Sequence, residues 1–172
     1  MPTIYLGLGT NLGDRESNLR EALRRLAELV RIEAVSSVYE SEPVGFRAQP
    51  DFWNLVVRGQ TELGPRALLG AIQEIERMMG RRPSFRNAPR VIDIDILLYD
   101  DVELDLPELS IPHPRMLERA FVLRPLAELA PGLVYPRTGR TIAEHLRSAT
   151  GLERAEPLFP GARLLDPRSE AG

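Results

Sequence analysis

The sequence predicts an α+β fold in which a mainly antiparallel sheet is covered by helices on one face. Three observations lead to this prediction. Strand-length stretches that are apolar or alternating recur along the chain, segments with helical periodicity separate them, and glycine or proline marks most of the boundaries. The 172 residues, 43% of them hydrophobic, suit a single globular domain that buries a core without disulfides or a structural metal.

The first half of the chain predicts three strands and two helices. Residues 3–9 are apolar and end in glycines, which predicts a strand followed by a turn, and residues 15–31 repeat apolar side chains at helical spacing. Residues 32–41 alternate and are rich in Val and Ser, as in a strand. Residues 52–61 predict another strand, and a proline opens a helix over 66–79.

The second half predicts one strong strand and two further helices. A basic loop at 81–90 leads into the strand 91–99, and helices are expected over 115–129 and 139–149. The order βαββαβ resembles the ferredoxin-like arrangement. Residues 1–151 are therefore expected to form the single domain. Residues 152–172, with three prolines and few large apolar side chains, are expected to be a loosely ordered extension.

The composition excludes several classes of site. The chain has no Cys and no Lys, which excludes thiolate metal sites, thiol nucleophiles, Schiff-base chemistry and the P-loop lysine. Its two His cannot build a three-His zinc site, so any metal is expected to be a hard cation on Asp or Glu. A net charge of -3 argues against general binding of nucleic acid or membrane surfaces.

The start of the chain and its hydropathy predict a cytoplasmic protein. No basic side chain precedes Arg15, which argues against a signal peptide, and no run approaches the roughly 18 apolar residues of a membrane helix. The sequence gives no sign of an obligatory protein partner.

A basic segment runs directly into an acidic one around residue 90. Five Arg and no acid lie between Arg77 and Arg90, whereas seven acids and no base lie between Asp93 and Glu108. Arginine forks bind phosphate oxygens, and Mg²⁺ is held by one or two carboxylates together with substrate phosphates. The reversal predicts a site for a metal-bound polyphosphate.

Asp93 and Asp95 are the strongest candidates in this segment. Because strand side chains alternate, both carboxylates share one face, with Cβ atoms roughly 7 Å apart. Such a pair is expected to hold Mg²⁺, and two ions could be bridged there. An edge strand with a simply solvated polar face is the alternative.

Four further positions are weaker candidates. His113 lies between two prolines and could contact a phosphate or donate a proton, although a loop histidine bonded to a carbonyl is the simpler interpretation. Arg119 follows six residues later and could reach the same polyphosphate. Phe52 and Asn54 share a strand face and could clamp a flat heterocycle, or could be an ordinary core Phe with a capping Asn.

Several separated motifs, in order, resemble the 6-hydroxymethyl-7,8-dihydropterin pyrophosphokinase family of the folate pathway. The similar segments cover roughly residues 3–147 and are GTNLG at 9–13, YESEPVG at 39–45, QPDFWN at 49–54, RNAPRVIDIDIL at 86–97, and IPH at 111–113 with RAF at 119–121. The chain departs from the family pattern at Pro83, Asn87 and Ala88.

The resemblance implies transfer of the β,γ-diphosphate of ATP to the pterin hydroxymethyl oxygen, with release of AMP. It implies two Mg²⁺ held by Asp93 and Asp95, and ATP as co-substrate. The catalytic residues it implies are Arg81, Arg86, Arg90, Asp93 and Asp95. The ATP contacts it implies are Gln73, Glu76, Arg81, Arg90, Ile96, Ser110, His113 and Arg119. The pterin contacts it implies are Ser41, Val44, Phe52, Asn54, Asp93 and Phe121.

Two rival functions remain open from the residues alone. An RNA-binding module would use aromatics on a basic sheet face, whereas this chain has 6% aromatics and places two carboxylates on its central strand. Another Mg²⁺-dependent phosphoryl or nucleotidyl transferase could use the same Asp-x-Asp pair.

Overall fold

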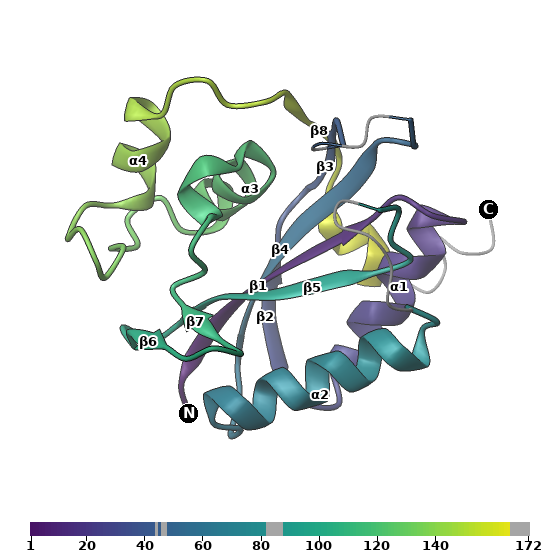
Figure 1. Cartoon of the computed structure of the whole chain (residues 1–172), viewed down its shortest axis with the longest axis horizontal. Coiled ribbons are helices and arrows are strands. Elements are labelled where there is room, and N and C mark those ends of the chain that lie inside the picture. Colours follow the sequence, from purple (N-terminus) through teal and green to yellow (C-terminus); the bar gives the residue numbers. More distant parts are fainter. Residues whose placement is uncertain (44, 46–47, 82–87, 166–172) are drawn as a thin grey trace.

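The computed structural model of the chain describes residues 1–43, 45, 48–81 and 88–165. A six-stranded sheet with the order β5-β1-β4-β3-β8 forms its centre, and β2 also pairs with β4 (Figure 1). The strands are β1 (Thr3–Thr10), β2 (Arg31–Val35), β3 (Val38–Ser41), β4 (Phe52–Gln60), β5 (Asp93–Tyr99) and β8 (Ala155–Phe159). Every pairing among them is antiparallel, so the predicted mainly antiparallel α+β fold is confirmed.

Helices cover both faces of this sheet rather than one face as predicted. The helices are α1 (Arg15–Leu26), α2 (Pro65–Met78), α3 (Ala120–Leu129) and α4 (Ile142–Ser148). Apolar side chains of α1 and α2 pack on one face with Leu6, Leu55 and Ile96, and those of α3 and α4 pack on the other with Val56 and Leu97. The reason is that the alternating strand residues are apolar on both sides over part of their length.

The boundaries differ from the prediction where local signals were weak. The first helix ends at Leu26, and the single strand expected over 32–41 is two strands, β2 and β3. They are separated at Ser36, whose hydroxyl accepts a hydrogen bond from Val56 N at 2.9 Å. The segment 100–114, for which no element was predicted, contains a small hairpin of β6 (Leu104–Asp105) and β7 (Ser110–Ile111), and a 3-10 turn, Met116–Glu118, precedes α3.

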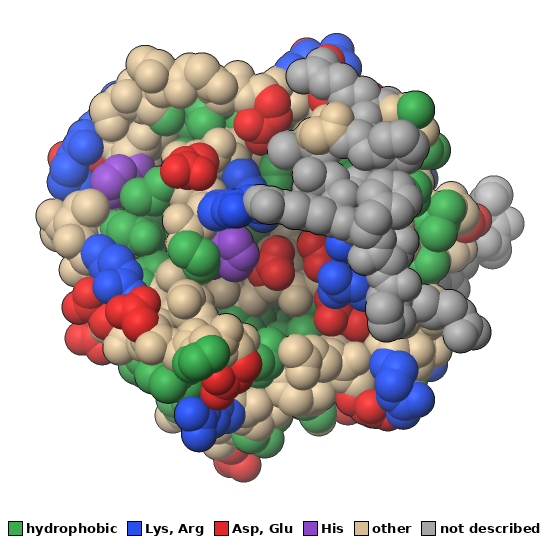
Figure 2. Space-filling model, in the orientation of Figure 1, with side chains coloured by type: hydrophobic (Ala, Val, Ile, Leu, Met, Phe, Trp, Pro, Cys, Tyr) green, Lys and Arg blue, Asp and Glu red, His purple; other side chains and the backbone are tan. Residues whose placement is uncertain are grey.

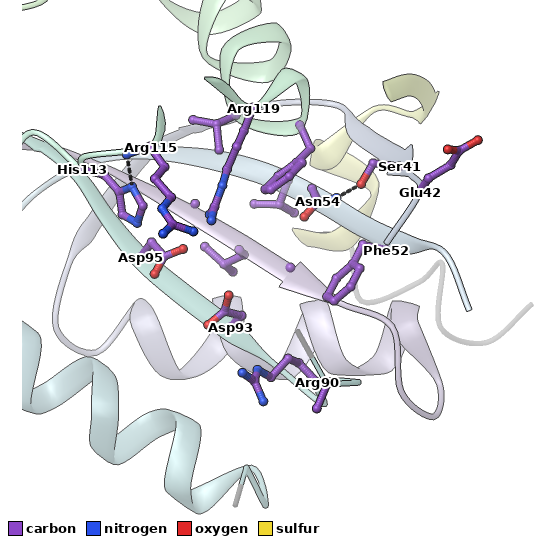
Figure 3. A pocket seen from close by; sticks show the side chains of 17 residues that line it. Ser41, Glu42, Phe52, Asn54, Arg90, Asp93, Asp95, His113, Arg115 and Arg119 are labelled. Atoms are coloured by element: carbon purple, nitrogen blue, oxygen red, sulfur yellow. Dashed lines mark hydrogen bonds between the residues drawn. The ribbon is translucent and has the colours of Figure 1, made fainter. Parts of the chain in front are cut away.

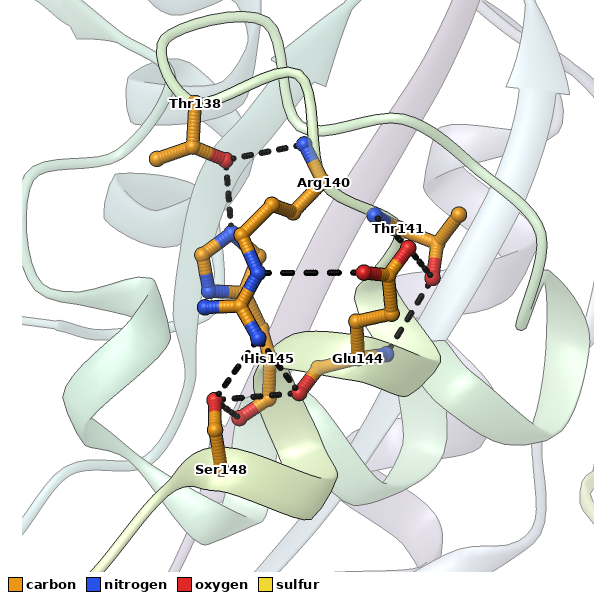
Figure 4. Close-up of polar contacts among 6 residues, drawn as sticks. All are labelled: Thr138, Arg140, Thr141, Glu144, His145 and Ser148. Carbon is orange, nitrogen blue, oxygen red and sulfur yellow. Dashed lines mark hydrogen bonds and ion pairs between the residues drawn. The ribbon is translucent and has the colours of Figure 1, made fainter.

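The segment from Thr138 to Ser148 is fixed by its own polar contacts (Figure 4). Thr141 caps α4, because its hydroxyl accepts from Glu144 N at 3.1 Å while the Glu144 carboxylate accepts from Thr141 N at 3.2 Å. The ring of His145 lies 2.7 Å from the Thr138 hydroxyl. The second histidine of the chain therefore serves this local structure.

Part of the segment that was expected to be a loose extension forms regular structure. Strand β8 pairs with β3, and a 3-10 turn, Gly161–Leu165, follows it. Leu164 is 4% exposed in the core beside α1, and its carbonyl accepts from Arg20 Nη1 at 3.2 Å. Within the described ranges, no helix has the length and apolar character needed to cross a membrane.

Candidate active site

A cavity of about 290 Å³ opens on the sheet face that carries α3, where the strands run beyond the cover of the helix. Figure 2 shows acidic, basic and histidine side chains gathered in a hollow near the middle of this face. The side chains that bear its chemistry are Ser41, Glu42, Phe52, Asn54, Arg90, Asp93, Asp95, His113, Arg115, Arg119 and Phe121. The cavity thus gathers residues from β3, β4, β5 and the start of α3.

Glycines on the central strand give this cavity its floor. In the register of β1 against β5, Gly9 lies opposite Asp93 and Gly7 lies opposite Asp95. Gly9 also lies opposite Asn54 of β4, and a Cβ atom at Gly9 would stand only 2.7 Å from Asn54 Oδ1. The absence of side chains on β1 therefore leaves room for a ligand between the acidic pair and the amide.

Asp93 and Asp95 both project from β5 into the cavity (Figure 3), as strand alternation predicts. Burial is the main cause that raises the pKa of the Asp95 carboxyl to about 7, and the neighbouring Asp93 charge adds to it, whereas Arg119 opposes it. Two carboxylates held this way favour a bound cation. Asp93 already forms an ion pair with one cationic side chain, because its Oδ1 lies 3.1 Å from Arg81 Nη1.

Glu76 lies beneath the acidic pair rather than in the cavity. It extends from α2 and is 7% exposed, and its Oε2 accepts from Ile94 N at 2.9 Å and from Arg81 Nη1 at 2.5 Å. Burial raises the pKa of its carboxyl, while the Ile94 amide and Arg81 act in the opposite direction. Glu76 therefore fixes strand β5 between the two aspartates and holds Arg81 against Asp93. Gln73, its neighbour on α2, is exposed outside the cavity lining.

His113 borders the cavity as a neutral imidazole. Burial, with Arg119 nearby, lowers the pKa of His113 to about 4, so of the two ligand roles considered for this residue, a phosphate contact by the neutral ring fits the free protein better than proton donation near neutral pH. Its Nδ1 accepts from Arg115 N at 3.1 Å, which leaves the proton on Nε2 (Figure 3). Its own backbone N–H donates to Leu97 O at 3.0 Å. The ring is thereby prepared to donate one N–H to a ligand.

Three arginines surround the acidic pair within the cavity. Arg119 and Arg115 extend over Asp95 from the segment before α3, and Arg90 lies beyond Asp93 (Figure 3). The backbone of Arg90 is held by Asn11, whose side-chain oxygen accepts from Arg90 N at 2.8 Å and whose N–H donates to Arg90 O at 3.0 Å. The Gly-Thr-Asn-Leu turn thus holds the backbone of an arginine that lines the cavity.

Aromatic and amide side chains form the end of the cavity away from His113. Asn54 is 5% exposed, and its Nδ2 donates to Ser41 Oγ at 2.7 Å, which leaves its Oδ1 facing the cavity floor at Gly9. Phe52 lies at the same end (Figure 3), and Phe121 also lines the cavity. An amide together with aromatic rings suits a flat heterocycle that carries hydrogen-bond donors.

The structure brings together most of the predicted site residues but not all of them. Ile96 is a core side chain, 4% exposed on the opposite sheet face, and Ser110 lies on β7 outside the cavity lining. Val44 and Arg86 lie outside the described residues. Arg115 and Glu42 were missed, although Arg115 could have been found from its position two residues after His113, beyond the rigid proline.

The donor set fits Mg²⁺. Among the residues that the structure describes, no group of three or more His, Asp or Glu side chains forms a complete metal site. Mg²⁺ is usually bound by one or two carboxylates and completes its shell with water and substrate phosphates. The pair at 93 and 95, with arginines for the phosphates nearby, has this character.

Comparison with known proteins identifies the family of this chain. Residues 5–131 match the family 7,8-dihydro-6-hydroxymethylpterin-pyrophosphokinase (HPPK). The 2-amino-4-hydroxy-6-hydroxymethyldihydropteridine pyrophosphokinase of Aquifex aeolicus is 44% identical over 136 residues, 79% of this chain and 85% of the relative. The enzymes of the same name from Bacillus subtilis and Pseudomonas aeruginosa are 46% identical over 127 residues and 44% over 164. They cover 73% and 92% of this chain and 76% and 98% of their own lengths.

The fold is also found in solved structures. The wild-type HPPK-DHPS of Plasmodium falciparum with pteroate matches 85% of this chain with a TM-score of 0.70 and 18% identity. This chain spans 42% of that longer protein.

Proposed function

This chain belongs to the 7,8-dihydro-6-hydroxymethylpterin-pyrophosphokinase family and is a diphosphotransferase of folate biosynthesis that acts on hydroxymethyldihydropterin, and we propose how its cavity carries out this reaction. The hydroxymethyl oxygen attacks the β-phosphorus of ATP, the bond from that phosphorus to the α-phosphate oxygen breaks, and AMP leaves. The hydroxyl proton passes to solvent. The β,γ-diphosphate is then bonded to the pterin.

Asp93 and Asp95 would hold two Mg²⁺ between them. Bound there, the ions supply positive charge to the transferred phosphates and lower the pKa of the attacking hydroxyl. The carboxylate repulsion on β5 supports this assignment, because the pair lies in a cavity where its charge is neutralised only in part by Arg81 and Arg119.

The arginines and His113 would bind the triphosphate. Arg90, Arg115 and Arg119 offer guanidinium forks around the acidic pair, and the Nε2–H of neutral His113 offers one further donor. A neutral imidazole suits this task, because it donates without adding a charge that would hold AMP after transfer. Arg81 lies next to the acidic pair and already forms an ion pair with Asp93. Arg86 stays a predicted catalytic residue and Gln73 and Ser110 stay predicted nucleotide contacts, whereas the core position of the Ile96 side chain does not fit such a contact, and Glu76 would act as a positioning residue.

Asn54, Ser41 and the rings of Phe52 and Phe121 would bind the pterin. The hydrogen bond from Asn54 to Ser41 fixes the amide, so its Oδ1 is presented to a ring N–H or amino group. The two rings would stack on the heterocycle, and Val44 stays a predicted contact. The hydroxymethyl group would then point along the floor of β1 toward Asp93.

One observation carries the proposal: the acidic pair, the arginines and the amide-aromatic end share a single continuous cavity. The test is incubation with ATP, Mg²⁺ and reduced hydroxymethylpterin. AMP and a pterin diphosphate in equal amounts support the reaction, whereas ADP or free diphosphate would point to another Mg²⁺-dependent transferase. Asp95→Ala should retain the fold and lose turnover, and an active variant would remove the metal assignment.

A further inference from the structure

The segment after α4 crosses the molecule to reach the walls of the active site. Figure 1 shows the chain passing from α4 over α3 to β8, at the edge of the sheet. This segment lies beyond residues 5–131, the part of the chain that the family match covers. It nevertheless contacts two elements that bear cavity residues, namely β3 and the first turn of α3.

The contact with α3 is a hydrogen bond to its first residue. The Oε1 of Glu153 accepts from Ala120 N at 2.9 Å, and the residue at the N-cap, Arg119, provides no side-chain cap of its own. The first N–H groups of a helix have no partner within it, and a carboxylate at this end also interacts favourably with the helix dipole. Glu153 therefore supplies from a distant segment the cap that the local sequence lacks.

The contact is reinforced by close packing around the same residue. Ala120 is fully buried and forms a small cluster with Ala155 and Tyr39, against which Phe121 and Leu152 pack. In the register of β8 against β3, Ala155 lies opposite Ser41, the partner of Asn54. The segment is thus bonded to both walls of the cavity, one at α3 and one at β3.

The residues on either side of Ala120 are the two that enter the cavity. Arg119 and Phe121 both line it, and the Arg119 guanidinium carbon lies 5.5 Å from the centre of the Phe121 ring. Arg119 and Phe121 are joined to residue 120 by single peptide units, so the position of the Ala120 backbone helps to place the Cα atoms from which both side chains enter the cavity. The hydrogen bond to Ala120 N and the packing of its methyl group hold that backbone in place.

We propose that Glu153 is a positioning residue for the reaction, which sets Arg119 for the nucleotide and Phe121 for the pterin by holding the amide of Ala120. This inference rests on the proposed function of the cavity. It predicts that one side chain outside both ligand sites affects the binding of both ligands.

The test compares Glu153→Ala with Glu153→Gln and with the matched control Glu156→Ala. Glutamine keeps an oxygen that accepts the hydrogen bond, and Glu156 is an exposed acid of the same segment. Dissociation constants for reduced hydroxymethylpterin and for a nonhydrolysable ATP analogue are measured by calorimetry, with kcat and KM from AMP release. We expect Glu153→Ala to raise the dissociation constant of each ligand about fivefold, which corresponds to the loss of one hydrogen bond. The dissociation constants of the other two variants should stay within about twofold of the wild type.

A purely structural role would lower the unfolding midpoint of Glu153→Ala and leave both dissociation constants of the folded protein unchanged, and that result overturns the proposal. Equal weakening by Glu156→Ala, or no rescue by Glu153→Gln, also overturns it. If Glu153→Ala does not fold, Glu153→Leu replaces it, since leucine fills similar space without an acceptor. AMP release by the wild type is measured before any variant is compared. If the wild type releases no AMP, the proposed function is refuted rather than the role of Glu153.

Discussion

Replacing Glu76 by Gln separates two effects of this residue. The substitution removes the negative charge that pairs with Arg81, but it keeps a hydrogen bond to the backbone of β5. Glutamine keeps an oxygen for Ile94 N, but it removes the negative charge at 2.5 Å from Arg81 Nη1. Arg81 then retains Asp93 as its ion-pair partner, at 3.1 Å. Because Asp93 is a proposed metal ligand, Arg81 and Mg²⁺ compete for the same carboxylate.

The magnitudes follow from the two contacts. A hydrogen bond to a charged group contributes about 1.5–3 kcal/mol, but the cost of burying the Glu76 carboxylate, which raises its pKa, offsets this contribution, so we expect Glu76→Gln to change the free energy of unfolding by less than about 1 kcal/mol. Glu76→Ala also leaves the buried Ile94 N–H without a partner, which costs about 1–3 kcal/mol. We therefore expect little loss in Glu76→Gln and a loss of about 2 kcal/mol in Glu76→Ala.

The assay is activity against Mg²⁺ concentration, alongside urea unfolding. We expect Glu76→Gln to need up to about fivefold more Mg²⁺ for half-maximal activity, which corresponds to about 1 kcal/mol of ion pairing shifted onto the partly exposed Arg81–Asp93 pair. Glu74→Gln is the matched control, because it is an exposed acid on the same helix that pairs with Arg77. An unchanged Mg²⁺ requirement in Glu76→Gln would refute the competition for Asp93.

Three further predictions concern the cavity itself. Asp95→Asn should abolish AMP release yet raise the free energy of unfolding of the metal-free protein at pH 8. A carboxyl pKa raised from 3.8 to about 7 corresponds to about 4 kcal/mol of lost stability, which water in the cavity reduces to about 2 kcal/mol. A lower stability of the variant in urea would contradict this reasoning. For His113 the folded pKa of about 4 lies below the ordinary 6.5, so protonation favours the unfolded chain, and the contribution of His113 to stability falls by about 2 kcal/mol from pH 7 to pH 5. His113→Asn should remove that part of the pH dependence of unfolding, and an identical pH profile would count against a neutral ring. Gly9→Ala places a Cβ 2.7 Å from Asn54 Oδ1 and should raise the KM for the pterin about tenfold with little change for ATP; equal changes for both substrates would show that the clash is not local to the amide.

Contacts between near neighbours could be predicted from the sequence. Strand alternation alone places Asp93 and Asp95 on one face, and the structure has them there. The charge reversal around residue 90 likewise indicated arginines near that pair. These predictions succeed because the interacting groups are close in sequence or lie on a strand of known periodicity.

Contacts between distant segments could not be predicted in this way. The role of Glu76 depends on α2 lying under β5, and the cap on α3 depends on Glu153, 33 residues further along the chain. The C-terminal segment has the composition of a loose tail, because β8 is an exposed edge strand that contains a proline and needs few large apolar side chains. Its order comes from pairing with β3 and from one buried leucine, neither of which has a local signal.

The charges of the free cavity explain how it accepts its ligands. Arg81 is held between Glu76 and Asp93, so the acidic pair is partly neutralised before any metal binds. If Mg²⁺ were bound by Asp93, Arg81 would lose that carboxylate and be free to contact the phosphates that accompany the ion. Binding of a metal-bound nucleotide would then be an exchange of partners, in which Arg81 leaves one negative group for another. Such an exchange would limit the cost of unpaired charge in the cavity, and it would require Glu76 to keep Arg81 within reach.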